Sequence, residues 1–170
     1  QTRGNLFIML AELVGNCHHH ARADDGLHGL ACAQTWYKDS RAQFAIADSG
    51  IGIRASLGEN PDLARRLAAQ NACELATEYG ISSKLGRGHA GYGLTLARDL
   101  AAQTPGSTLF VQSCGEAILV EGQKVTSISD FDYAIPGTLV LFEWDMGKTL
   151  DLEDVYRNWP DAESDQHDYF

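Results

Sequence analysis

The stretch Asp48-Ser-Gly-Ile-Gly-Ile53 decides the fold of this chain. It follows Gln43–Ala47, a short apolar run that is typical of a strand, so Asp48 comes at the carboxyl end of that strand. The Ser-Gly-Ile-Gly after it predicts a tight loop, because Gly50 and Gly52 have no Cβ to obstruct a sharp turn. A carboxylate beside exposed backbone can bind a ligand that lies against the loop.

A second glycine-bearing string, Gly86-Arg-Gly-His-Ala-Gly-Tyr-Gly-Leu94, follows about forty residues later. Residues 80–93 contain five glycines and few apolar side chains, so we expect a mobile flap there. Leu94 opens an apolar helical pattern that continues to Ala101. The free N–H groups at the start of that helix, around Gly91 and Gly93, are suited to phosphate oxygens.

An amphipathic helix precedes both strings. Its apolar stripe has three-and-four spacing from residue 5 to about residue 21 and consists of Leu6, Met9, Leu10, Leu13, Val14 and Cys17. Glu12 and Asn16 are four residues apart on this helix, so their side chains share one face and can address one ligand.

The remaining pattern gives a fold class. We expect strands over Leu30–Tyr37, Gln43–Ala47, Thr108–Ser113, Ala117–Glu121 and Thr138–Trp144. A middle helix runs from an Asn60 cap and Pro61 to about Ala76. The order predicts an α/β (α+β) two-layer sandwich: one mixed, mostly antiparallel sheet of about five strands, three helices on one face and a glycine-rich lid. The domain spans residues 1–149, followed by an acidic tail over 150–170.

The tail from residue 150 carries seven acids and one arginine, so we expect it to be solvated. Its apolar residues can alternatively dock on the domain or on a partner. These are Val155, Tyr156, Trp159 and Phe170.

Composition excludes some classes of protein. The 170 residues fit a single domain, and the net charge of -10 argues against nucleic acid as a partner. An anionic chain that binds a nucleotide needs a divalent cation, placed bases or a helix N-terminus. The four cysteines form no C-x-x-C pair, and no apolar run is long enough for a bilayer, so we expect a cytoplasmic protein with no membrane partner.

These residues match what magnesium-ATP requires. Asp48 can accept a hydrogen bond from the adenine amine, whereas the guanine carbonyl would face it repulsively. Asn16 can offer its carbonyl oxygen to magnesium, and Glu12 can orient or deprotonate a water or hydroxyl. Lys84 and Arg87, with His89, can close over the phosphates from the flap.

In these motifs the chain resembles the GHKL superfamily, the ATP-binding fold of histidine kinases, type II topoisomerases, heat-shock chaperones and mismatch-repair ATPases. The resemblance covers Asn5 to about Met146. The family's N box falls on Glu12 and Asn16, with His20 at a position that is often basic near the phosphates. The first glycine box falls on Asp48, Gly50 and Gly52, and the second, which includes Gly88, on Gly91 and Gly93. The resemblance implies a Bergerat-type sandwich that holds magnesium-ATP beneath a lid.

Other interpretations of the motifs are weaker. Residues 86–91 satisfy G-x-G-x-x-G, but no hydrophobic strand precedes them as a dinucleotide fold requires. His18, His19 and His20 point about 100° apart on a helix, so they cannot converge on one metal ion. Gly15 stands where the family usually has an acid before the asparagine, which makes the phosphate geometry less well defined than the adenine geometry.

Three hypotheses for function follow from the resemblance. The first is a kinase or ATPase that transfers phosphate to a protein partner or switches conformation with ATP and ADP. The anti-sigma serine kinases have a similar compact size. The second is a non-catalytic nucleotide-sensing interaction module. The third is a clamp ATPase that forms a homodimer, which usually needs a lysine from a further domain.

Overall fold

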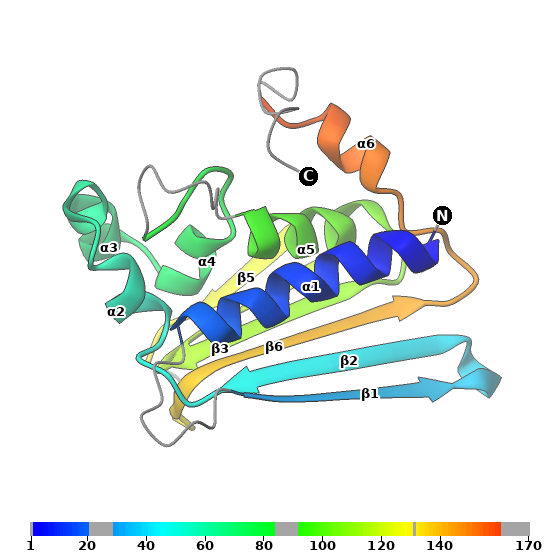
Figure 1. Ribbon diagram of the computed structural model, residues 1–170, viewed down its shortest axis with the longest axis horizontal. Coiled ribbons are helices and arrows are strands. Elements are labelled where there is room, and N and C mark those ends of the chain that lie inside the picture. The colour runs from blue at the N-terminus through cyan, green and yellow to red at the C-terminus, as the bar shows by residue number, and fades with distance from the viewer. Residues whose placement is uncertain (1, 21–28, 84–91, 131, 161–170) are drawn as a thin grey trace.

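The chain forms a two-layer α+β structure with one open sheet and helices over one of its faces (Figure 1). The computed structural model describes residues 2–20, 29–83, 92–130 and 132–160, apart from the side chains of residues 17–20. Because helices cover one face of a single sheet, the two-layer architecture predicted from the element order is confirmed.

The sheet has six strands in the order β1-β2-β6-β3-β4-β5, and every neighbouring pair runs antiparallel. The strands are β1 (Leu30–Trp36), β2 (Arg41–Asp48), β3 (Thr108–Cys114), β4 (Glu116–Glu121), β5 (Lys124–Ile128) and β6 (Ile135–Asp145). The prediction of a mostly antiparallel sheet is thus confirmed, whereas none of the described strands pairs in parallel and the sheet has one strand more than the five or so expected. The missed strand, β5, has only two apolar residues, and it pairs with β4 through the Gly122-Gln123 hairpin.

Six α-helices occur in the described residues, twice the number expected. They are α1 (Thr2–His20), α2 (Ile53–Leu57), α3 (Ala64–Ala69), α4 (Ala72–Ala76), α5 (Tyr92–Gln103) and α6 (Leu152–Arg157). Two 3-10 turns, η1 (Tyr37–Asp39) and η2 (Pro61–Leu63), complete the regular structure. The two long helices, α1 and α5, pack against each other and across the sheet.

The core lies between these two helices and the sheet. Alternate residues of β2 are buried, including Phe44, whose ring stacks on Phe142 of β6 at a centroid distance of 5.6 Å. Met9 on α1 is fully buried above them, and full burial of such a side chain stabilises the fold by about 1.5–3 kcal/mol. Val14, which the sequence pattern placed on the buried stripe, is 50% exposed.

The expected single helix from Asn60 to Ala76 is interrupted. Asn60 does act as a cap, because its side chain accepts from the N–H of Asp62 at 3.0 Å. The chain then becomes extended at Gln70, and Asn71 caps α4 by accepting from the N–H of Cys73 at 2.9 Å. Apolar spacing alone does not reveal the break, since it continues across it.

The expected solvated tail is wrong for residues 150–159, which pack on the domain. Leu150, Leu152 and Val155 are at most 3% exposed, and the Leu150 carbonyl accepts from the Asn5 side chain at 2.7 Å. The acids of this stretch serve the helix instead: Asp151 caps α6 by accepting from the N–H of Glu153 at 3.0 Å. The alternative expectation of docking holds here, and residues 161–170 lie outside the described chain.

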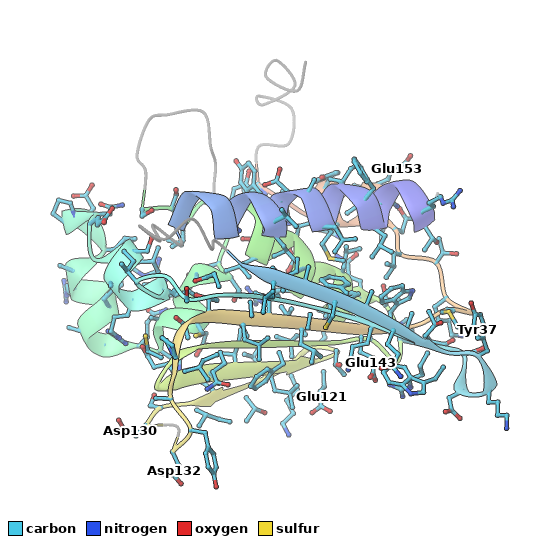
Figure 2. All side chains as sticks on the ribbon, turned by 60° about the horizontal axis from the view of Figure 1, so that its bottom comes forward. Tyr37, Glu121, Asp130, Asp132, Glu143 and Glu153 are labelled. Atoms are coloured by element: carbon cyan, nitrogen blue, oxygen red, sulfur yellow. The ribbon has the colours of Figure 1, made fainter. Side chains whose placement is uncertain are left out.

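Acidic side chains border the sheet on the side away from α1. Figure 2 shows Glu121, Asp130, Asp132 and Glu143 there, while Glu153 lies on the helical side. Of the helices described, none is both long and apolar enough to cross a bilayer.

Candidate functional site

The predicted site residues come from three elements that end or begin at the same end of the molecule (Figure 1). The last turns of α1 carry Glu12 and Asn16, β2 ends at Asp48, and α5 begins beside Gly93. The antiparallel sheet and the direction of the two helices therefore place at one end of the molecule residues that are as far as 81 positions apart in sequence.

The contact between α1 and α5 depends on Gly93. A Cβ at Gly93 would lie 3.0 Å from the Asn16 amide nitrogen and 3.1 Å from the Glu12 Cβ. Such distances are tighter than ordinary packing, so a side chain at this position would have to push Asn16 or Glu12 away by a few tenths of an ångström. Asn16 is half-buried and Glu12 is exposed at this contact.

Asp48 is held at the end of β2 by a turn and by a close backbone neighbour. Its Oδ1 accepts from the N–H of Gly50 at 2.8 Å. This bond fixes the carboxylate over the start of the loop of residues 49–52, which we call the glycine loop. Gly137 of β6 has φ +77°, and a Cβ there would lie 2.7 Å from the Asp48 Oδ1 and closer still to the Asp48 carbonyl oxygen. Thr138 is the cross-strand partner of Asp48, and its hydroxyl lies 3.4 Å from the Ser113 Oγ.

The glycine loop closes on Ser113 of β3. Gly52 has φ 78° and ψ 166°, a conformation essentially restricted to glycine, and a Cβ there would lie 2.9 Å from the Ser113 Oγ. The buried Ser113 hydroxyl accepts from the N–H of Ile53 at 2.8 Å and donates to the Gly137 carbonyl at 2.9 Å. One hydroxyl thus joins the loop to the backbone beside Asp48.

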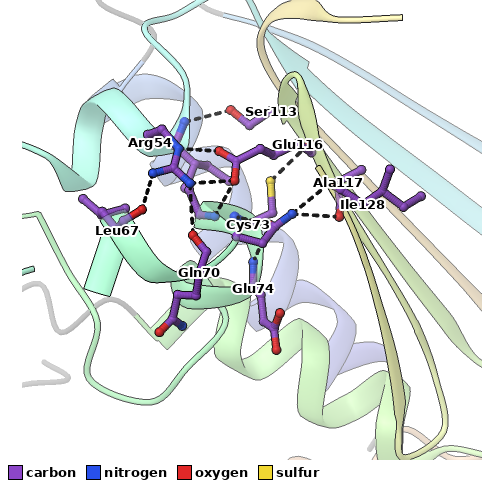
Figure 3. Close-up of polar contacts among 12 residues, drawn as sticks. Arg54, Leu67, Gln70, Cys73, Glu74, Ser113, Glu116, Ala117 and Ile128 are labelled. Carbon is purple, nitrogen blue, oxygen red and sulfur yellow. Dashed lines mark hydrogen bonds and ion pairs between the residues drawn. The ribbon is translucent and has the colours of Figure 1, made fainter. Parts of the chain in front are cut away.

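A polar cluster anchors the helices that follow the loop (Figure 3). Arg54 of α2 binds both carboxylate oxygens of Glu116, through Nε at 2.6 Å and Nη2 at 2.7 Å. Its Nη2 also donates to the Gln70 carbonyl at 3.0 Å, and Glu116 accepts from the N–H of Ala72 at 2.9 Å. This bidentate pair joins α2, the α3–α4 break and the β3–β4 turn.

Two pKa shifts follow from this cluster. Burial acts to raise the pKa of Glu116, but the hydrogen bonds from Arg54 and from the Ala72 N–H outweigh it and lower the pKa. Burial, followed by the charge of Glu116, raises the pKa of the Cys73 thiol to about 12. Glu116 is therefore ionised and Cys73 neutral at physiological pH.

We predict that Cys73 resists alkylation in the native protein at pH 8, while the exposed Cys32 and Cys114 react. The thiolate is the nucleophile, and with a pKa of about 12 roughly one thiol in ten thousand is ionised at pH 8. Iodoacetamide labelling read by peptide mass spectrometry checks this. Unfolded protein, in which Cys73 should label fully, is the control, and equal native rates for Cys73 and Cys114 would contradict the prediction.

Several predicted site residues lie outside the described chain, so the structure does not place them. These are Lys84, Arg87, Gly88, His89 and Gly91. His20 belongs to α1, but its side chain is not described, while Leu94 is half-buried in the first turn of α5 and packs on the core.

Sequence reasoning missed three contributors to the site. These are Gly137, Ser113 and the Arg54–Glu116 pair, and each acquires its role through a contact between distant strands and loops. The Pro136-Gly137 dipeptide, shortly before a strand, was the one available signal.

The described residues contain no group of three or more His, Cys, Asp or Glu side chains able to hold a metal ion. A cation at Asn16 would therefore take other ligands from a bound phosphate or water. No protein-family model matches the chain, and no curated protein shows significant similarity to it.

Proposed function

We propose that this protein binds magnesium-ATP at the end of the sandwich where Asp48, Asn16 and Gly93 lie, in the manner of GHKL proteins. The observation that carries the proposal is the α1–α5 contact, in which Gly93 lies against Glu12 and Asn16. Two motifs picked from sequence as parts of one nucleotide site, about eighty residues apart, are in direct contact.

Adenine is assigned to the Asp48 side of the site. The carboxylate is fixed by the Gly50 N–H at 2.8 Å, so it needs little reorganisation to accept the exocyclic amine. The Thr138 hydroxyl on the neighbouring strand adds a second polar group of the kind that orients a base. Gly52 lets the loop that would lie against the base pack closely on Ser113.

The phosphates are assigned to the α1–α5 contact. The first N–H groups of an α-helix have no partner within the helix, and the positive end of the α5 dipole lies at Tyr92. The amide nitrogen of Asn16 is the atom nearest to a Cβ built on Gly93, which leaves the carbonyl oxygen as the proposed ligand for magnesium. These donor types fit a magnesium-nucleotide, and bound magnesium would neutralise phosphate charge.

Glu12 is the residue assigned to proton transfer. It is exposed and one helical turn from Asn16, so it can reach a water or a hydroxyl near the terminal phosphate. Transfer to a protein hydroxyl and ATP-driven switching are both compatible with this position. In each, the partner is a protein that approaches the end of α1.

Calorimetry with ATP, ADP and GTP, with and without magnesium, tests the proposal. We expect ATP binding that magnesium strengthens and a preference for adenine over guanine. Equal binding of GTP, or no nucleotide binding, would overturn it. Phosphate release from wild type and from Glu12→Ala then separates turnover from sensing, since a sensor would bind ATP, release no phosphate above background and be indifferent to the substitution.

We predict that Gly93→Ala weakens ATP binding, by roughly tenfold. The added methyl would have to displace the Asn16 amide or the Glu12 Cβ by a few tenths of an ångström, which disturbs the proposed magnesium ligand. Gly15→Ala is the matched control: it is also a helical glycine, but nothing lies within 4 Å of its Cβ position. Alanine there should stabilise α1 by about 0.5–1 kcal/mol and leave ATP affinity unchanged. Equal affinities for the two variants would contradict the prediction.

A further inference from the structure

Three aromatic rings meet beside the start of α5, and we call Tyr79, Tyr92 and Trp159 the aromatic clamp. The two tyrosine rings stack at 5.0 Å with their hydroxyls 3.2 Å apart. The Trp159 indole contacts both, with centroids 5.1 Å from Tyr79 and 5.0 Å from Tyr92. Each ring therefore contacts the other two.

The clamp joins distant positions of the chain. Tyr79 precedes the glycine-rich stretch, Tyr92 is the first residue of α5, and Trp159 follows α6. Tyr92 is adjacent to Gly93, the residue packed against Asn16 and Glu12. A shift of the Tyr92 ring would therefore move the backbone of Gly93, which lies at the proposed phosphate site.

Trp159 itself is firmly held. Its indole N–H donates to the Asp99 carboxylate at 2.7 Å, and Tyr156 packs edge-on against it at 5.1 Å. The buried Val155 fixes α6 on α5, and at the other end of the segment Leu150 is bonded to Asn5 of α1. Residues 150–159 consequently form a strap that connects the start of α1 to α5 (Figure 1).

We infer that Trp159 is a positioning residue that holds the start of α5 in register with α1, and that the C-terminal strap thereby sets the geometry of the proposed phosphate site. Its effect on ATP rests on the proposed function, whereas its effect on α5 does not. A ring without the indole N–H should preserve most of the effect, because stacking on the tyrosines supplies the contact.

Hydrogen exchange without nucleotide tests the first half of this inference. The amides of Leu96 and Ala97 bond to the carbonyls of Tyr92 and Gly93 in the first turns of α5. In Trp159→Ala we expect them to exchange about tenfold faster than in wild type, with wild-type rates in β2 and most of the change reversed in Trp159→Phe. Trp36→Ala, at the end of β1, is the matched control with no expected change in α5. Unchanged exchange rates in α5, or a uniform rise in exchange rates across the sheet, would refute the inference that Trp159 holds the start of α5.

Nucleotide affinity tests the second half. Trp159→Ala should raise the Kd for ATP about tenfold, and Trp159→Phe should restore it to within about threefold of wild type. If wild type binds no ATP, the proposed function fails, but the exchange rates still show whether Trp159 holds the start of α5. If wild type binds and Trp159→Ala binds equally well despite faster exchange, the link from strap to site is refuted.

Discussion

Asp48→Asn should weaken ATP binding by roughly 10- to 100-fold with little loss of stability. A hydrogen bond to a charged group contributes about 1.5–3 kcal/mol, and each 1.4 kcal/mol is a factor of ten in affinity. Asp48 is the proposed acceptor for the adenine amine, so removing its charge removes the interaction that would distinguish adenine from guanine. Calorimetry on wild type and variant measures the change.

Asparagine is the sharpest replacement because it separates ligand binding from local structure. Its carbonyl oxygen can still accept from the Gly50 N–H, which the carboxylate does at 2.8 Å, so the turn after β2 should persist. The amide N–H group is then the one presented to the base, and it meets another donor on adenine. Loss of affinity without loss of fold would identify the carboxylate as a recognition group.

Asp39→Asn supplies the control for this experiment. Asp39 is an exposed aspartate in η1, at the opposite end of β2, and the same change of charge there should leave the affinity unchanged. Indifference of ATP affinity to Asp48→Asn, or an equal loss in both variants, would refute the adenine site. Binding that Asp48→Asn shifts towards GTP would strongly support it.

Features with local physical causes could be predicted from the sequence. Asp48 at a strand end, the Asn60 cap and the first strand depend on residues within a few positions of each other, and the structure has all three. The helical positions of Glu12 and Asn16 follow from periodicity alone. Their contact with Gly93 was not predicted, because no local pattern encodes the approach of α1 to α5.

Features that depend on distant contacts could not be predicted. β5 has little apolar pattern and forms because β4 offers an edge, while Ser113 acquires its role from two loops that only the folded sheet brings together. The strap was concealed by composition. The seven acids of residues 150–170 suggest a solvated tail, yet Leu150, Leu152 and Val155 are buried against the domain.

Gly137→Ala should be the most damaging small substitution near the site, with an expected loss of about 2–5 kcal/mol in the free energy of unfolding. Its φ of +77° costs a residue with a Cβ about 1–2 kcal/mol, and overpacking commonly adds 1–3 kcal/mol. The obstacle is the Asp48 backbone itself, with the carbonyl carbon 2.7 Å from the Cβ position, so no side chain can rotate away.

Gly122→Ala isolates the steric part of that loss. Gly122 also has a positive φ, +56°, but nothing lies within 4 Å of its Cβ position. Gly122→Ala should therefore lose only the part of the free energy of unfolding that comes from the backbone conformation, about 1–2 kcal/mol. Urea denaturation of the two variants gives the difference between them. If Gly137→Ala unfolds at the same urea concentration as Gly122→Ala, the backbone of β6 does not confine Asp48 as described. A larger loss in Gly137→Ala, accompanied by weakened ATP binding in the folded fraction, would mean that the glycine places the carboxylate as well as permitting the fold.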